Sequence, residues 1–200
     1  MFCRLTMNFR RSRRNFIARP TTMLAFVILI LAALSRFLPH TFHGTALNFT
    51  AVGAGLLFFG SRRPRSEFVL AVALMAVTDA VLTRMVYHFP FHIRGYVVTW
   101  CWYAAACLLG TALLRKLTPL RVVAAVFASA TGFFLASNFM VWLGSGMYAH
   151  TPAGLADCFY AALPFYGNDL LSTGIFSALF FGVPALARML ARDVAFPSRP

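Results

Sequence analysis

The sequence predicts an all-α integral membrane protein, a compact bundle of six transmembrane helices with both termini in the cytoplasm. Composition is the first reason: 60% of the residues are hydrophobic and only 12% are charged, whereas soluble domains are about a quarter charged. The second is a mean hydropathy of +0.74. The third is that the apolar residues form continuous runs, which is typical of spanning helices and not of alternating barrel strands.

The apolar runs define the expected helices, because a helix needs roughly 20 apolar residues, with about 17 as a lower limit, to cross a bilayer. They divide the chain into a basic cytoplasmic tail (1–22), one membrane domain (23–190) and a short cytoplasmic tail (191–200). Pro184 is expected to kink the last helix. The six predicted spans are 23–38, 47–60, 68–83, 96–114, 122–143 and 170–190.

The second predicted span is too short for an ordinary crossing, since a helix over 47–60 would reach only about 21 Å. Non-helical backbone at membrane depth is tolerated only inside protein or beside a watery cavity. We therefore expect the preceding stretch PHTFHGTALNF to fold into the bundle as a lid. The alternative is a tilted helix, or a locally thinned bilayer, with an ordinary surface loop.

The segment 144–169, GSGMYAHTPAGLADCFYAALPFYGND, contains an apolar stretch that is too short to cross the bilayer. We therefore expect an interfacial or re-entrant hairpin between the last two spans.

Lys and Arg residues are distributed unevenly over the predicted loops. The two tails, the loops 61–67 and 115–121, and Arg188 at the end of the last span carry 15 of the 18 basic residues, and the opposite side carries Arg36, Arg84 and Arg94. Basic loops stay in the cytoplasm, so both termini are expected there. The net charge of +13 then reflects topology and attraction to anionic lipids, and we do not expect nucleic-acid binding.

The N-terminus allows a second interpretation, because a basic tail followed by an apolar run also describes a signal peptide. LAALSRF has no clean A-x-A cleavage site, which favours a retained first span. Cleavage would remove one helix without inverting the others.

The predicted topology places the polar side chains on the outer side of the membrane. An ionisable residue inside a span is a functional hypothesis by default. Asp79 is the clearest case: it can pair with Arg84, five residues on, or contact a ligand. The outer side also receives all five histidines, His40, His43, His88, His92 and His150, together with Asn48, Asn138, Asn168, Asp157 and Asp169.

Metal and nucleotide sites find little support. His40 with His43, and His88 with His92, have spacings that one ion could use, but Pro39 and Pro90 disturb the helical geometry. We predict no metal site. No nucleotide-binding or hydrolase motif is recognisable, so active transport would need partner proteins or an ion gradient. Small residues four apart, at Ala76/Ala80 and at Ala124/Ala128/Gly132, favour close helix approach.

The stretches RFLPH…NFTAVGAGLLFFG, TDAVL and SNFMVWL…ALPFYGNDLLSTGIFSALFFG resemble, over about residues 23–187, a widespread bacterial membrane family of unassigned function. That family is similar in size and layout to the substrate-binding S components of energy-coupling-factor vitamin transporters. The resemblance implies a multi-pass protein of the bacterial inner membrane. It also implies an outer-facing vitamin site capped by the loop after the first helix, and an energy-coupling membrane subunit with ATPases as partners. Two departures affect the lid: the lengthened PHTFHGTALNF, and YAHT where the family has Y-P-x-T.

These observations together predict a small-molecule-binding membrane protein, not an enzyme, that acts as the substrate-capture subunit of a transporter. The ligand would be a vitamin-like cofactor in the outer half of the bundle, with cobalamin as the boldest candidate because histidines are available. Two alternatives remain: an intramembrane enzyme acting on a lipid or prenyl substrate, and a non-transporting scaffold of a membrane complex. The predicted contacts are Arg36, His40, Asn48, Asp79, Asn138, Trp142, Tyr148 and Asn168.

Overall fold

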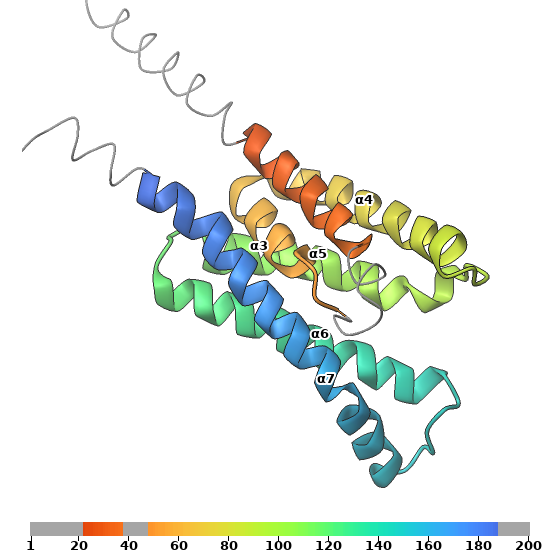
Figure 1. The fold of residues 1–200 in the computed structure, drawn as a ribbon. Coiled ribbons are helices and arrows are strands. Elements are labelled where there is room, and N and C mark those ends of the chain that lie inside the picture. Colours follow the sequence, from red (N-terminus) through yellow and green to blue (C-terminus); the bar gives the residue numbers. More distant parts are fainter. Residues whose placement is uncertain (1–21, 38–47, 188–200) are drawn as a thin grey trace, which may run out of the picture.

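The structure is a computed structural model that describes residues 22–37 and 48–187, and these residues form six helices and no strand. Figure 1 shows them packed side by side as a bundle. Short π-helical turns follow α4 at Leu82–Val86 and α7 at Ala178–Gly182. The helices are Thr22–Phe37, α3 (Val52–Arg62), α4 (Phe68–Val81), α5 (Val97–Leu113), α6 (Pro119–Gly144) and α7 (Pro152–Ser177).

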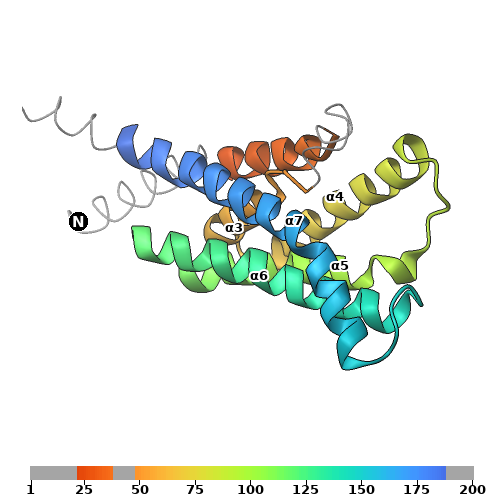
Figure 2. The same cartoon turned by 60° about the horizontal axis from the view of Figure 1, so that its bottom comes forward.

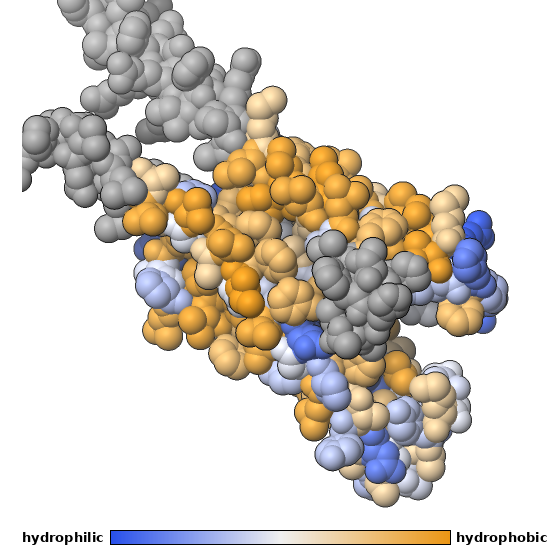
Figure 3. Space-filling model, in the orientation of Figure 1, coloured by the Kyte–Doolittle hydropathy of each residue, from blue (hydrophilic) through white to orange (hydrophobic). Residues whose placement is uncertain are grey.

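The all-helical prediction is confirmed for the described residues. Three helical segments, Arg65–Val86, Pro119–Gly144 and Pro152–Ala187, are long and apolar enough to cross a membrane; Thr22–Phe37 and Val97–Leu113 are apolar but shorter. Large apolar side chains face outward along α6, where Leu120 is 79% exposed and Phe127 51% exposed. The space-filling view in Figure 3 shows the same apolar surface over much of the bundle. Such a surface suits lipid better than water.

The short second helix is the buried centre of the bundle. Every residue of α3 from Ala54 to Gly60 is buried, among them Leu57 and Phe59 with no exposed surface. The helix packs against α5 and α7, and Gly55 lies against Ala32 of the first helix. Over this stretch α3 is therefore surrounded by protein, while the lid expected just before it stays a prediction. Most of the expected lid, residues 38–47, lies outside the described residues.

The closest helix approach is between α3 and α5. A Cβ on Gly60 would stand 1.9 Å from the carbonyl oxygen of Cys107, and one on Gly110 would stand 2.2 Å from that of Leu57. The Thr111 hydroxyl also donates to the Gly60 carbonyl at 2.8 Å. The two backbones touch at this crossing because neither glycine carries a side chain.

The small residues that the sequence suggested for close helix approach contribute less to helix packing than these two glycines. Ala76, Ala80 and Ala128 are only partly buried and Ala124 is exposed. Gly132 makes room for a side chain and not for a helix, since its Cβ would stand 2.2 Å from the Trp102 ring. Four-residue spacing alone does not say which helix face meets a neighbour.

The expected hairpin over 144–169 is wrong. From Pro152 the chain forms one helix that continues through Ser177 and the π-helical turn to Ala187. The Thr151 hydroxyl caps its start by accepting from Gly154 N at 3.1 Å, and Pro152 occupies the first turn, where a proline costs nothing. Pro164 lies inside the helix without ending it. A kink at Pro184 stays a prediction, but the π-helical turn just before it is a common way to absorb a missing N–H.

The bundle has two different ends. In Figures 1 and 2 the start of the first helix, the α5–α6 connection and the end of α7 lie toward one end, and the α4–α5 and α6–α7 connections lie toward the other. Arg63, just after α3, joins the first end, because it donates to Thr22 Oγ1 at 2.7 Å. The loops predicted to be basic therefore gather at one end, and His88, His92 and His150 belong to connections at the other.

Candidate ligand-binding site

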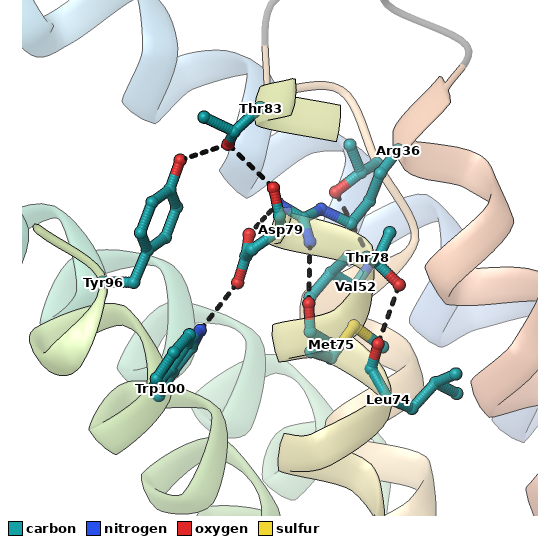
Figure 4. Close-up of polar contacts among 10 residues, drawn as sticks. Arg36, Val52, Leu74, Met75, Thr78, Asp79, Thr83, Tyr96 and Trp100 are labelled. Carbon is teal, nitrogen blue, oxygen red and sulfur yellow. Dashed lines mark hydrogen bonds and ion pairs between the residues drawn. The ribbon is translucent and has the colours of Figure 1, made fainter. Parts of the chain in front are cut away.

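A charged cluster ties three helices together near the histidine-bearing end (Figure 4). Arg36, in the 3₁₀ turn that ends the first helix, contacts the Asp79 carboxylate of α4 through Nη2 and Oδ1 at 2.5 Å. The second carboxylate oxygen of Asp79 accepts from the indole N–H of Trp100 on α5 at 2.9 Å. The Asp79 side chain is 1% exposed and that of Arg36 is 18% exposed. A carboxylate buried this deeply requires both partners.

Of the two alternatives for Asp79, pairing with Arg84 is not found. Arg84 is exposed and lies over the Phe91 ring, with 5.9 Å from its Cζ to the ring centroid. Five residues along a helix correspond to a rotation of about 140°, so the two side chains leave α4 in different directions. The ion pair instead joins residues 43 positions apart.

The backbone changes from α-helical to π-helical geometry directly after this cluster. The Thr83 hydroxyl donates to the Asp79 carbonyl oxygen at 2.7 Å and lies 2.5 Å from the Tyr96 hydroxyl. Thr83 belongs to the π-helical turn Leu82–Val86. Such turns inside α-helices occur frequently at functional sites.

The segment that enters α3 is held in place from the first helix. Ser35 Oγ accepts from the Ala51 backbone N–H at 2.8 Å while donating to the Ala32 carbonyl at 2.7 Å. Asn48 has φ of 62°, a left-handed conformation that asparagine tolerates better than most residues. These features bring non-helical backbone from Asn48 to Ala51 beside the charged cluster.

The cluster forms one side of a cavity of about 250 Å³. Residues from the first helix and from α3 to α7 contribute, and polar groups are mixed with aromatic rings. Its lining comprises Arg36, Asn48, Thr50, Val52, Gly53, Leu56, Asp79, Tyr96, Thr99, Trp102, Tyr103, Ala106, Ser129, Phe133 and Asp169.

A second cavity of about 200 Å³ adjoins the first and shares Asn48, Phe133 and Asp169 with it. Asn138 of α6 lines this second cavity, and its side-chain amide donates to the Phe134 carbonyl at 2.8 Å. The two cavities are therefore neighbours between the start of α3 and the pair α6 and α7.

Four of the eight predicted contacts line this region: Arg36, Asn48 and Asp79 in the first cavity, and Asn48 with Asn138 in the second. His40 lies outside the described residues. The other three, Trp142, Tyr148 and Asn168, line neither cavity.

Trp142 has a different role from the predicted one. Its indole N–H donates to the Ala149 carbonyl at 2.9 Å, and its ring centroid lies 5.3 Å from that of His150. It therefore fastens the connection between α6 and α7.

Asp169 is the most informative residue of the lining, and it was not among the predicted contacts. It was placed on the outer side as part of the expected hairpin, whereas it belongs to the middle of α7 and lines both cavities. An acidic residue next to the apolar run 170–190 was the signal that could have identified it. The aromatic side chains Tyr96, Trp102, Tyr103 and Phe133 were also missed as lining, since rings are common throughout this chain.

Three of the five histidines that suggested a corrinoid belong to the described residues, and none of these three lines a cavity. His88, His92 and His150 are exposed and line neither cavity. Within residues 22–37 and 48–187 no group of three or more His, Cys, Asp or Glu side chains is placed to hold a metal ion. The described cavity instead has the size and the mixed lining of a site for a small organic molecule.

Comparisons with known proteins give one match. The profile of a family of unknown function, DUF6580, matches residues 16–195. No curated protein and no solved structure matches the chain. The resemblance to a family of unassigned function is confirmed by this match, while the likeness of that family to vitamin-transporter S components stays a prediction.

Proposed function

The chain belongs to the DUF6580 family, whose function is unknown, and we propose that it is a membrane-embedded small-molecule-binding protein that captures a substrate for a transporter. The observation that carries the proposal is the cavity of about 250 Å³, lined by polar and aromatic residues of six helices and held by the Arg36–Asp79 ion pair. Polar side chains that converge on a cavity in an otherwise apolar bundle mark binding sites.

The position of the cavity agrees with capture from outside. Arg36 ends the first helix, whose start lies at the basic end, and Asp79 stands three residues before the π-helical turn that leads to the histidine-bearing α4–α5 connection. With six crossings and both termini in the cytoplasm, the basic end faces the cytoplasm and the cavity belongs to the outer half. The membrane would be the inner membrane of a bacterium.

Two features support binding over a purely structural role. The lining contains more hydrogen-bonding groups than the ion pair uses, among them Asn48, Thr99 and Ser129. A structural cluster needs no adjoining cavity, whereas this one lines a cavity that shares Asn48, Phe133 and Asp169 with a second cavity. The stretch before Asn48, proposed as a lid, would cover a ligand in this region.

The test is to purify the protein in detergent and to identify any bound small molecule by mass spectrometry of the intact complex and of its extract. Asn48→Ala and His40→Ala are expected to lower the affinity for that molecule about 5- to 150-fold, because a buried ligand group loses its partner. The control is Arg65→Ala, an exposed residue at the basic end, which should leave binding unchanged.

Arg63 is unsuitable as that control, because it pairs with Glu67 and also donates to Thr22. Release of a chemically altered molecule by the purified chain would favour an intramembrane enzyme. Absence of any bound molecule, together with equal behaviour of the three variants, would contradict the proposal and favour a scaffold.

A further inference from the structure

The cavity contains one guanidinium group, and that group is already occupied. Nη2 of Arg36 contacts Asp79 and Nη1 points to the Met75 carbonyl at 3.4 Å. The second oxygen of Asp79 is taken by Trp100. The pair is therefore neutral as a unit and satisfied by its neighbours, so it is a poor receptor for an anionic ligand.

Asp169 carries the remaining charge of the lining. Two carboxylates, Asp79 and Asp169, line the first cavity together with one guanidinium, which leaves one negative charge in excess. In the part of the chain that the structure describes, the ion pairs are Arg36–Asp79 and Arg63–Glu67, and neither includes Asp169. Asp169 is half-buried; a carboxylate that is partly removed from water without a cationic partner costs free energy, and a cationic ligand would offset that cost.

The partial positive charge at the N-terminus of α3 offsets the negative charge of Asp169 only in part. Val52 and Gly53 line the same cavity, and the first turn of a helix carries roughly half a positive charge. The full charge of Asp169 outweighs it, so the local field still favours a cation.

Aromatic rings form much of the remaining wall, since Tyr96, Trp102, Tyr103 and Phe133 all line the first cavity. The Trp102 ring is seated against Gly132, where a side chain would collide with it at 2.2 Å. Tyr96 stacks on Trp100 with 6.2 Å between ring centroids. Rings held in this way attract a cation through their faces and also cover the flat part of an aromatic ligand.

The volume limits the ligand further. Drug-sized ligands occupy pockets of about 300–1,000 Å³, and the first cavity has about 250 Å³. A molecule with one small ring system and a short side chain fits this space, whereas a corrinoid would have to extend well beyond the described lining.

We infer that the cavity takes a small aromatic molecule that carries a positive charge, such as a protonated amine, and that the Asp169 carboxylate contacts this charge. The inference rests on the proposed function and assigns the chemical class of its substrate. The rings would hold the flat part of the molecule and Asn48, shared by both cavities, would offer it hydrogen bonds.

The experiment compares three molecules of similar shape and different charge: tyramine, which is cationic, tyrosol, which is neutral, and 4-hydroxyphenylacetate, which is anionic. Their binding to the full chain in detergent is measured by calorimetry and by the tryptophan fluorescence to which Trp102 contributes. Tyramine is expected to bind at least tenfold more tightly than the other two. Asp169→Asn is expected to weaken tyramine binding about 10- to 100-fold, since a charged hydrogen-bond partner is lost, and to leave tyrosol binding within a few-fold.

The matched control is Asp157→Asn, which makes the same change at an exposed position of the same helix and should not alter tyramine binding. Tighter binding of tyrosol or of 4-hydroxyphenylacetate would overturn the inference but leave the proposed function intact, because a small molecule would still occupy the cavity. No binding of any of the three would also overturn the assigned class. The proposed function itself is then decided separately, by mass spectrometry of the co-purified molecule.

Discussion

The Arg36–Asp79 ion pair is the side-chain contact on which the site depends most. The Asp79 side chain is almost completely enclosed, with 1% exposure, whereas Arg36 retains 18%. A buried charge that loses its partner typically costs about 3–5 kcal/mol. A long arginine side chain, however, can move its charged group toward a polar surface, so the two partners should respond unequally to substitution.

We therefore expect Arg36→Met to lower the unfolding temperature more than Asp79→Asn, because the first leaves a carboxylate stranded at full burial. The double variant should be more stable than the sum of the single effects implies. Thermal unfolding in detergent measures all three. Additive effects would show that the two groups do not stabilise each other.

The control pair is Arg63–Glu67, which has the i, i+4 spacing and side chains that are 17% and 24% exposed. The pair joins the extended end of α3 to the following 3₁₀ turn, and partly exposed pairs contribute only about 0.2–1 kcal/mol. Glu67→Gln should therefore shift the unfolding temperature far less than Asp79→Asn.

Asn48 combines a backbone role with a side-chain role, and substitution can separate them. Its φ of 62° costs a residue with a side chain about 1–2 kcal/mol, whereas glycine adopts this conformation freely. We expect Asn48→Ala to destabilise the fold more than Asn48→Gly. Both variants lose the amide and should lose the co-purifying molecule alike. If only Asn48→Ala lost that molecule, the amide would have no part in binding.

The contact between α3 and α5 determines how tightly the helices pack around the site. Gly110→Ala would place a Cβ 2.2 Å from the Leu57 carbonyl oxygen, so one of the two backbones must move. Overpacking of this kind costs typically about 1–3 kcal/mol. We expect a clear drop in the unfolding temperature.

The matched control is Gly174→Ala on α7, where a Cβ would meet nothing within 4 Å. Alanine is the better helix former by up to about 1 kcal/mol, so this variant should be as stable as the parent chain or slightly more stable. Equal losses from both substitutions would mean that glycine flexibility, and not close approach, is what matters.

The continuity of α7 can be measured directly. Ala156 and Ala178 are both exposed and can carry spin labels on cysteine. Along an uninterrupted helix their backbones are about 33 Å apart, at about 1.5 Å per residue. Electron–electron resonance should give a narrow distribution near that distance. A re-entrant hairpin would fold the two positions back on each other and give a much shorter one.

The bundle as a unit has one basic end and one end with histidine-bearing connections, and this asymmetry predicts its orientation in a membrane. Arg65 and Arg115 are exposed at the first end, and Gly146 belongs to the connection at the other. Cysteine at Arg65 or Arg115 should be labelled by membrane-impermeant reagents only after cells are opened, while cysteine at Gly146 should react in intact spheroplasts. External labelling at either arginine would invert the topology and move the cavity to the cytoplasmic half.

Composition and the length of the apolar runs sufficed to predict the helices. Each segment that lies in lipid must satisfy its own backbone hydrogen bonds, and a helix does so without help from other segments. Four of the six predicted ranges match a described helix within three residues at each end, whereas α3 begins five residues later than predicted and α7 begins 18 residues earlier. Arg36, Asn48, Asp79 and Asn138 could be identified as lining residues for the same local reason, since polar groups are rare in such segments.

The sequence did not predict which of these groups meet. Asp79 contacts Arg36 and not Arg84, because the rotation of each helix about its axis is set by packing against its neighbours. Asp169 became part of the lining only because α7 continues through Pro164 and brings its middle beside α3 and α6. Proline, glycine and asparagine near that point favour a break when taken locally, and contacts along the whole length of α7 override that preference. Some of the residues that line the cavity could therefore be identified from the sequence. Which side chains they contact was decided by tertiary packing.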